Sequence, residues 1–379
     1  MLAFSTVVAI AATVPAALAA TATQAAAVGI DALAPSVSRT YCGNDIWAVS
    51  VTPARGFNPL TATAAQLESN GYPAKPSSAN ARGLAQWRSF ATSHSAEKTS
   101  CDLRSTTTSA TSMNHSDPET TTANWAGYVV YGGAFTEIEG EWTYTPAPAT
   151  ATSMHSVSWV GLGPGDLCPA GVPCYPLVQA GSDSSTGADG SDLWFEVVPF
   201  SAKLDLELSN GQIFVPQDLD IIAVHIAVYN DTVETGCSNQ ACTATATCTA
   251  EACGLIHVSD LTQDFNESYE VGGDWQNGGQ AEWIYERPCI GPVGSSTCEL
   301  QSLADAPPTF SDAEALVDGG SWQSIGTLYS TASPYAVQPV EMVDCSSADS
   351  TPDLAAPVIP PSGSTITINF MHHGLVDTC

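Results

Sequence analysis

A carboxylate and a carboxamide each interrupt an apolar run of this sequence. Glu282 lies in the run 281–286, where every second residue would share one face of a strand, and Gln179 lies in the run 176–181. A carboxylate on a sheet face is costly unless it has a use. If the two side chains faced each other across a groove, they could hold one water molecule and one carbonyl group between them.

Other interpretations of these residues stay open at this point. Asp and Glu are mostly exposed in proteins, so Glu282 could simply lie on a solvated outer face. Glu196 and Glu282 could instead form the two-carboxylate site of a glycoside hydrolase, or belong to a lectin-like binding module without catalysis. Gln179 separates these alternatives, because a glycosidase has no necessary use for it, whereas a water-activating Glu/Gln pair fails without it.

The charge of the chain divides near residue 120. Seven basic and seven acidic residues precede Asn124, whereas only Lys203 and Arg287 oppose the thirty-two acidic residues that follow it. Such a region repels itself at neutral pH and relaxes as its carboxylates protonate, at about pH 4 for ordinary Asp and Glu. The charge therefore favours a protein that works in acid, or else a highly soluble or halophilic surface. It excludes nucleic-acid binding through phosphates, which needs basic residues.

Residues 1–19 form an apolar leader without acidic residues. The leader ends in Ala-Leu-Ala, a small-x-small sequence typical of signal peptidase sites, so we expect a signal peptide that is cleaved after Ala19. No later segment has the run of about 18 apolar residues that a membrane-spanning helix needs. We therefore expect a secreted, extracellular protein with no membrane contact.

Residues 20–120 predict a small mixed propeptide and a linker. An extended stretch is expected over 41–51, and a helix over 80–95, where Leu84, Trp87 and Phe90 recur at helical spacing. The Ser/Thr-rich residues 105–122 read as the linker. The basic residues of this propeptide could neutralise part of the negative charge of the acidic domain at neutral pH, and the propeptide could dissociate as the carboxylates protonate. We therefore expect the propeptide to act as an inhibitor.

Residues 121–379 predict one all-β domain, a two-sheet antiparallel β-sandwich. Short apolar or alternating runs are separated there by Gly, Pro, Asn and Asp, and their lengths and turn residues are typical of such a sandwich. The Cys-, Thr- and Gly-rich residues 231–279 are expected to form an insertion. The expected strands are 125–131, 138–144, 157–162, 177–180, 193–198, 204–208, 221–229, 281–285 and 365–370.

Twelve cysteines in an exported chain predict disulfides. Cys42 and Cys101 lie in the leading part and ten cysteines in the acidic part, so each part can close its own bridges. Spacing suggests the pairs 168–174, 289–298 and 345–379, although sequence alone leaves the connectivity open. The cluster at 237, 242, 248 and 253 lacks the close pairs usual in zinc sites, so paired disulfides are expected there rather than a metal.

Several familiar catalytic patterns are absent from the sequence. It contains no Gly-x-Ser-x-Gly, no His-Glu-x-x-His and no Asp-Thr-Gly or Asp-Ser-Gly. Histidine would be protonated in an acid enzyme and could not act as a base. Carboxylates are therefore the natural acid and base for this chain.

Five short motifs give the chain a specific resemblance to the glutamic peptidases (eqolisins, peptidase family G1). They occur over residues 124–286 in the order seen in that family, and the resemblance spans most of residues 124–370. The motifs are Asn-Trp-Ala-Gly at 124–127, Ser-Trp-Val-Gly at 158–161, Leu-Val-Gln-Ala-Gly at 177–181, Asp-Leu-Trp-Phe-Glu at 192–196 and Ala-Glu-Trp-Ile-Tyr-Glu at 281–286.

The resemblance implies a concanavalin-like sandwich, a secreted zymogen, and endopeptidase activity at acid pH on polypeptide substrates without cofactor or metal. Glu282 falls on the family's catalytic Glu and Gln179 on its catalytic Gln. A cleft-lining role is implied for Trp159, and Asp192 and Glu196 match acidic positions near the site.

Three further expectations concern the cleft and the oligomeric state. We assign Trp283 to the substrate cleft together with the residues above, although burial in the core is the competing interpretation. Two departures from the family pattern, Gly163 in place of an Asp and Val198 in place of an aromatic residue before Pro199, bear on substrate preference. We expect a monomer.

Overall fold

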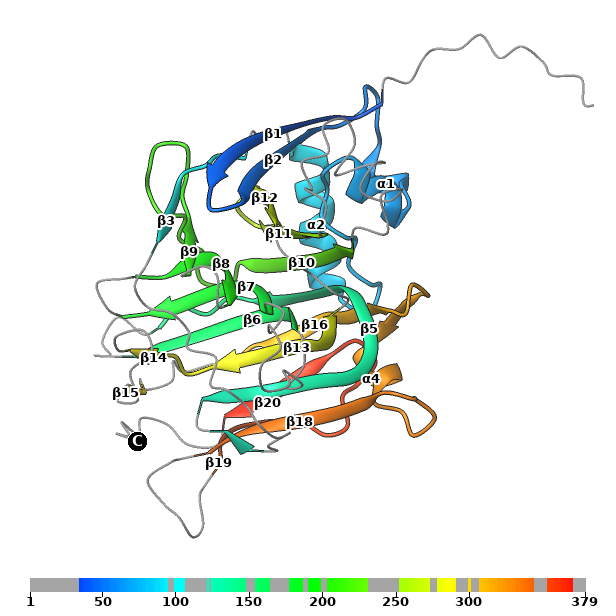
Figure 1. The fold of residues 1–379 in the computed structure, drawn as a ribbon, viewed down its shortest axis with the longest axis vertical. Coiled ribbons are helices and arrows are strands. Elements are labelled where there is room, and N and C mark those ends of the chain that lie inside the picture. The colour runs from blue at the N-terminus through cyan, green and yellow to red at the C-terminus, as the bar shows by residue number, and fades with distance from the viewer. Residues whose placement is uncertain are drawn as a thin grey trace, which may run out of the picture.

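The computed structural model of the chain consists mainly of antiparallel strands, with a few short helices near the N-terminus (Figure 1). The residues that the structure describes are 34–94, 99–105, 121–122, 124–147, 154–163, 177–186, 190–198, 203–230, 252–272, 278–290, 299–300, 307–343 and 353–370. The expected signal peptide and most of the linker lie outside these residues.

Strand β5 (Trp125–Thr143) is the longest element and joins two layers of sheet. Its first half pairs with β13 (Gly278–Glu286) and β18 (Ala336–Val343). Its second half pairs with β10 (Ile221–Asn230) and β16 (Thr309–Val317). Figure 1 shows β5 curving from one layer into the other. The expected strands 125–131 and 138–144 are therefore two halves of one bent strand.

The first layer continues from β13 through β6 (His155–Gly163), β7 (Leu177–Ser185), β8 (Asp192–Val198) and β9 (Leu204–Leu206). The second layer continues from β10 through β11 (Ala252–Asp260) and β12 (Phe265–Gly272). The remaining elements are β4 (Thr121–Thr122), β14 (Cys289–Ile290), β15 (Glu299–Leu300), β17 (Trp322–Ser324), α4 (Ile325–Leu328), β19 (Asp353–Pro357) and β20 (Ile366–Phe370).

The two layers pack face to face around one apolar core, which confirms the predicted all-β sandwich. Alternate residues of each strand point into this core, and they come from β6, β7, β8 and β13 on one side and from β10, β11 and β12 on the other. Phe195 and Tyr269 meet across the core with ring centroids 4.9 Å apart. Trp142 Nε1 donates to Ser182 Oγ at 3.0 Å across the same gap.

The range 231–279, expected to be an insertion, contains two full strands of the second layer. Strand β11 pairs with β10 on one side and with β12 on the other along nearly its whole length. Residues 252–260 and 265–272 are thus regular strands of the sandwich, in which Ser, Asn and Glu residues are interspersed with apolar residues that face the core. The cysteine cluster and the other proposed disulfides of the acidic part involve side chains outside the described residues.

The leading segment, residues 34–105, is built onto the second layer. It contains β1 (Ser36–Gly43), β2 (Ile46–Thr52), a 3-10 turn (Pro59–Thr61), α1 (Ala64–Ser69), α2 (Ala81–Ser93) and β3 (Leu103–Ser105). A Thr63 capping box begins α1, and the Asn80 side chain caps α2. Cys42 and Cys101 form a disulfide, so the leading part closes its own bridge as predicted. No helix of the described residues is long and apolar enough to span a membrane.

Gly127 marks a close approach between β5 and β13. Its φ of 154° is one that side-chain-bearing residues rarely adopt, and a Cβ there would meet the Trp283 carbonyl oxygen. We expect Gly127→Ala to lower the free energy of unfolding by about 2 kcal/mol or more, because it combines overpacking with backbone strain. Denaturant unfolding of the purified chain measures this.

Gly132→Ala is the matched control, since Gly132 has a φ of 88° with open space around its missing Cβ. It should cost only the strain, about 1 kcal/mol. Equal losses in the two variants would contradict the close packing of β5 on β13.

Candidate active site

Glu282 and Gln179 lie in one row that runs across the first layer. Glu282 of β13 is paired with Gly161 of β6, and Gly161 is paired with Gln179 of β7. Gln179 is in turn paired with Glu196 of β8. Directly paired residues of antiparallel strands point to the same face of a sheet, so these side chains share one face. With one strand between them, the Cα atoms of Glu282 and Gln179 are roughly 10 Å apart.

Glycines on β6 let neighbouring side chains pack closely between Glu282 and Gln179. Gly161 lies directly between them, and a Cβ there would be 3.0 Å from atoms of Trp159 and Leu177 on the same face. A Cβ at Gly163 would lie 3.4 Å from Glu282 Oε1. Gly163 is the position where the family tends to carry Asp, so in this chain the carboxyl of Glu282 has no such carboxylate neighbour on β6.

Gln179 is held by Glu196. The amide Nε2 of Gln179 donates to Glu196 Oε2 at 2.9 Å. Among the described residues nothing donates a hydrogen bond to Gln179 Oε1, which is buried. A carboxamide has two N–H donors and one carbonyl acceptor. Glu196 thus fixes the orientation of the amide and leaves one N–H and the carbonyl oxygen for other partners.

Glu196 itself is a carboxyl group with a strongly raised pKa. Burial raises the pKa of Glu196 from 4.5 to about 8, although the hydrogen bond from Gln179 lowers it and nearby Glu286 raises it further. Glu196 is therefore uncharged throughout the acid range. The Gln179 amide consequently has no negative charge beside it at acid pH.

Trp159 and Glu286 form a second fixed pair on the same face. Trp159 is fully buried, and its Nε1 donates to Glu286 Oε2 at 2.7 Å. Burial raises the pKa of Glu286 to about 7, and hydrogen bonds from Trp159 and Trp125 oppose this rise. Trp159 packs with Val129, Leu177 and other apolar residues of this face, so it forms the floor beside the row rather than an exposed wall.

Asp192 does not reach the row. It forms part of a buried ion cluster in which Lys203 Nζ lies 2.9 Å from Asp183 and Asp192 and 3.1 Å from Asp205. Burial would raise the pKa of Asp183, but Lys203 and His155 lower it below its ordinary value. For Asp192, by contrast, burial raises the pKa well above its ordinary value. The cluster joins the ends of β7 and β8 and so stiffens the strands that carry Gln179 and Glu196.

Trp283 lies on the other face of β13, and its assignment to the cleft is corrected here. It belongs to the sandwich core, and its Nε1 donates to the backbone oxygen of Glu139 at 2.8 Å. The physical reason is the two-residue period of a strand, which sends Trp283 and its neighbour Glu282 to opposite faces. The roles of Lys203 and Asp183 in the buried ion cluster were not predicted from the sequence. The available signal was the rarity of Lys203, one of only two basic residues after Asn124.

The described residues contain no group of three or more His, Cys, Asp or Glu side chains arranged to hold a metal ion. The side chains that gather at the row are instead a carboxyl, a carboxamide and a second carboxyl. This donor set suits proton transfer and hydrogen bonding to a carbonyl group.

Comparison with known proteins identifies a family whose model matches part of this chain. Residues 123–235 match the model of the Peptidase A4 family, the eqolisin or G1 family of glutamic peptidases. This match confirms the predicted resemblance. It also confirms the prediction of a glutamic-type endopeptidase, a hydrolase of peptide bonds. The match covers the strands that carry Trp159, Gln179 and Glu196. The curated proteins contain no match to this chain.

Three solved glutamic peptidases are similar to the chain. Scytalido-glutamic peptidase with a transition state analog inhibitor is 20% identical, with 66% of this chain and 98% of that chain covered and a TM-score of 0.47. SCP-B, described as a member of the Eqolisin family, is 19% identical, with 66% and 98% covered and a TM-score of 0.45. Aspergilloglutamic peptidase from Aspergillus niger is 20% identical, with 57% and 99% covered and a TM-score of 0.35.

The raised pKa of Glu196 predicts how stability depends on pH at this site. The contribution of Glu196 to the free energy of unfolding is fully present below about pH 4.5 and is lost as the pH rises through about 8. The reason is that Glu196 holds its proton more tightly in the folded state than in the unfolded state. The wild type should lose up to about 4 kcal/mol of unfolding free energy through Glu196 between these pH values, since one pKa unit is worth about 1.4 kcal/mol. We expect Glu196→Gln not to show this loss. Denaturant unfolding at pH 4.5 and pH 8 measures it.

Asp218→Asn, on an exposed turn, is the matched control and should leave the pH dependence of unfolding as it is in the wild type. A Glu196→Gln variant that loses as much stability between pH 4.5 and pH 8 as the wild type would show that Glu196 is not a buried, protonated carboxyl.

Proposed function

We propose that the chain is a secreted acid endopeptidase in which Glu282 and Gln179 act together on one water molecule and one peptide bond. The observation that carries this proposal is their place in one row across β13, β6 and β7, with only Gly161 between them. A carboxylate and a carboxamide on one face can act together on a scissile carbonyl and its attacking water once Trp159 and Leu177, which pack over Gly161, make way for the substrate.

Peptide hydrolysis needs a nucleophilic water, a stabilised oxyanion and a protonated leaving amine. In the proposed reaction Glu282 takes a proton from the water as the water oxygen bonds to the carbonyl carbon. The N–H of Gln179 that Glu196 does not use donates to the oxyanion that forms, and the Gln179 carbonyl orients the water. Glu282 then returns the proton to the peptide nitrogen as the C–N bond breaks.

Glu196 is a positioning residue in this scheme. It fixes the Gln179 amide through the 2.9 Å hydrogen bond, which keeps the donor ready before the substrate binds. Because burial raises the pKa of Glu196 to about 8, it stays neutral in acid and does not oppose the negative charge that develops on the oxyanion. At higher pH its ionisation would oppose that charge, which is one physical reason for activity restricted to acid.

The same geometry weighs against a two-carboxylate glycosidase. Glu282 and Glu196 are three strands apart along the row, roughly 14 Å between Cα atoms, and Gln179 stands between them. Glu196 is also already engaged by Gln179, so it is poorly placed to act as a nucleophile or a proton donor to a sugar.

The burial of the pair supports a zymogen. Gln179 is 2% exposed and Glu282 4% exposed in the full-length chain. A polypeptide substrate must contact both side chains, so the groove over them has to open before turnover. Activation by cleavage of the chain, after removal of the signal peptide, would provide that opening. We expect the mature enzyme to act as a monomer and outside the cell.

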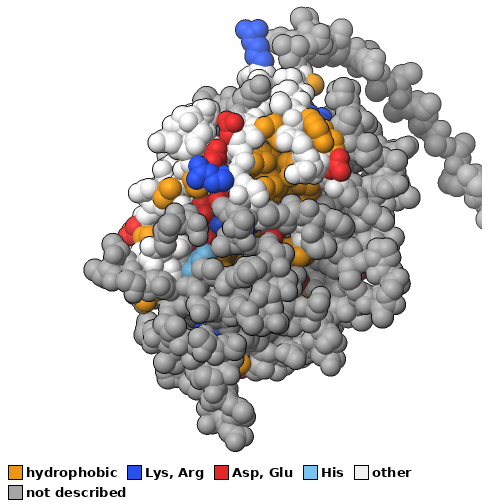
Figure 2. Space-filling view, turned by 60° about the vertical axis from the view of Figure 1, so that its left-hand side comes forward, with side chains coloured by type: hydrophobic (Ala, Val, Ile, Leu, Met, Phe, Trp, Pro, Cys, Tyr) orange, Lys and Arg blue, Asp and Glu red, His pale blue; other side chains and the backbone are white. Residues whose placement is uncertain are grey.

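A surplus of acidic groups supports function at low pH. After Asn124 only Lys203 and Arg287 balance thirty-two carboxyl groups. On the face drawn in Figure 2, basic side chains are few and separate, and they form no basic patch on the described surface. Acid relieves the mutual repulsion of the carboxylates, so the charge that would strain the domain at neutral pH is diminished where the enzyme works.

The proposed roles predict different losses for the two partners. Glu282→Gln should abolish nearly all hydrolysis, because a carboxamide cannot accept the proton of the water. Gln179→Ala should lower kcat roughly a hundredfold or more, since an oxyanion donor is worth about 2.7 to 4 kcal/mol. Both are measured on acid-activated enzyme with an unfolded protein such as casein at about pH 3 to 4, within the ordinary titration range of carboxyl groups, with pepstatin added to exclude aspartic peptidases.

Asp218→Asn serves as the control for expression and activation. Glu282→Gln with wild-type turnover would refute the assignment, and hydrolysis of β-glucan in place of casein would favour the carbohydrate-active alternative.

A further inference from the structure

The leading segment, residues 34–105, extends both layers of the sandwich instead of resting on its surface. Strand β2 pairs with β12, with Ala48 opposite Tyr269. Strand β3 pairs with β9, with Leu103 opposite Leu206. Backbone hydrogen bonds of this kind do not depend on pH, so they hold the segment whether or not carboxyl groups are charged.

Helix α2 packs on the second layer through apolar residues. Trp87 and Phe90 are buried in one cluster with Ile221 and Leu261 of the sandwich. Burial of such large apolar side chains is strongly favourable. The apolar cluster is a second connection between the segment and the sandwich that is independent of charge.

A polar latch joins the start of α2 to β5 and β16. Asn80 Nδ2 donates to Glu141 Oε1 at 2.6 Å and to Asp312 Oδ2 at 3.1 Å, and the backbone N–H of Ser77 donates to Asp312 Oδ1 at 3.0 Å. Glu141 approaches the first turn of α2 so closely that a Cβ at Gly83 would collide with its carboxyl group. The segment therefore covers the Glu141 carboxyl directly.

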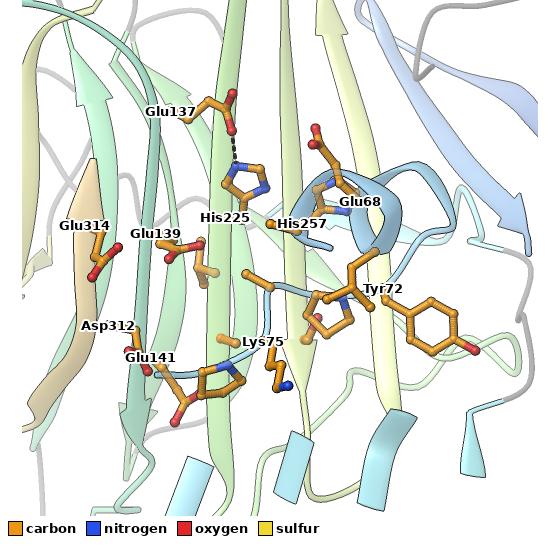
Figure 3. A pocket seen from close by; sticks show the side chains of 18 of the residues that line it. Glu68, Tyr72, Lys75, Glu137, Glu139, Glu141, His225, His257, Asp312 and Glu314 are labelled. Carbon is orange, nitrogen blue, oxygen red and sulfur yellow. Dashed lines mark hydrogen bonds and ion pairs between the residues drawn. The ribbon is translucent and has the colours of Figure 1, made fainter. Parts of the chain in front are cut away.

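Beside the latch, the segment closes a cavity of about 550 Å³ over the second layer. Figure 3 shows carboxyl groups of β5 and β16 on one side of this cavity and side chains of the leading segment on the other. Its ionisable lining residues are Glu68, Tyr72 and Lys75 of the leading segment, Glu137, Glu139 and Glu141 of β5, His225 of β10, His257 of β11, and Asp312 and Glu314 of β16. Neither Glu282 nor Gln179 lines it, so it is distinct from the proposed active site.

We propose that residues 34–105 remain bound to the sandwich as a permanent second chain after the linker is cut, and that acid strengthens this contact. The segment would thus be a structural subunit of the active enzyme, and its departure would not be the step that opens the groove. This inference does not depend on the chemistry of Glu282 and Gln179.

The carboxyl groups that the segment covers determine the sign of the pH effect. Burial raises the pKa of Glu139 and of Glu141 from 4.5 to about 8, and it also raises the pKa of Glu314. Groups whose pKa is higher in the bound state take up protons on binding. Their contribution to binding is fully present below about pH 4.5 and is lost as the pH rises through about 8.

The ion pairs of the segment do not reverse this sign. Arg39 makes two hydrogen bonds of 2.7 Å to Glu270, yet burial still leaves the pKa of Glu270 above its ordinary value. Burial alone would lower the pKa of His225, but Glu137, 3.0 Å away, raises it to about 9. His257 opposes the trend, because burial lowers its pKa to about 3. Four carboxyl groups with raised pKa values therefore favour binding of the segment in acid, and the His257 imidazole, with its lowered pKa, opposes them.

This direction of the pH effect is opposite to the one expected from the charge of the segment alone. The basic residues of the segment suggested release in acid as the carboxylates lose their charge. The structure shows instead that the segment buries several carboxyl groups with little cationic compensation, so that protonation favours the bound state. Ionisation at high pH places uncompensated charge beneath the segment, which is costly.

The test uses the full chain with a site for a specific protease placed at positions 110–116. After cleavage, size-exclusion chromatography at pH 4 and at pH 9 shows whether the two pieces travel together, and circular dichroism shows that the sandwich stays folded. We expect one peak containing both pieces at pH 4, and a dissociation constant at least tenfold higher at pH 9. Separation of the pieces at pH 4 would overturn the proposal.

The double variant Glu139→Gln/Glu141→Gln should lose clearly less affinity between pH 4 and pH 9 than the wild type, although Glu270 and Glu314 keep part of the dependence. Asp45→Asn, at an exposed residue of the same segment, should behave like the wild type. A double variant with the full wild-type pH dependence would overturn the assignment to these two groups. The chromatography of the two pieces does not depend on whether Glu282→Gln hydrolyses casein. Failure of one proposal therefore leaves the other untouched.

Discussion

The register between β6 and its two neighbours is the constraint on which the site depends. A strand repeats every two residues, so a shift of one residue in either pairing would send Glu282 or Gln179 into the apolar core. The pairing of Gly161 with both residues prevents this, and the absence of a side chain at Gly161 lets Trp159 and Leu177 pack closely over it. The bent strand β5 and the Lys203 cluster fix the strands at either side of that row.

Several carboxyl groups of the described residues are buried. Glu139, Glu141, Glu196 and Glu286 all have pKa values raised to between about 7 and 8, in each case chiefly by burial. A protein adapted to neutral pH would lose stability by burying so many ionised groups. In acid the same groups are neutral hydrogen-bonding partners, so the fold gains a polar interior without charge. The acidic composition and the buried carboxyl groups both fit the proposed function in acid.

Much of the fold could be predicted because strands and helices have strong local patterns. Alternation identified β6, β7, β8, β10 and β13, and helical spacing of Leu84, Trp87 and Phe90 identified α2. The bend of β5 could not be predicted, since Gly132 and Gly133 look like a turn between two strands. Strands β11 and β12 were hidden because their outer face is polar where the leading segment covers it. The residues of the row were predicted by type and motif. Strand alternation places Trp283 and Glu282 on opposite faces, which favours the core interpretation of Trp283 over its assignment to the cleft, and Asp192 could not be placed without knowing where Lys203 lies.

The central claim is that Glu282 and Gln179 act as one unit across Gly161. A double-mutant cycle of kcat with Glu282→Gln, Gln179→Ala and the double variant tests it most directly. The account predicts that the double variant loses about as much activity as Glu282→Gln alone, because the Gln179 N–H has no developing oxyanion to stabilise when residue 282 cannot activate the water. Losses that multiply would show two independent residues and would contradict the account.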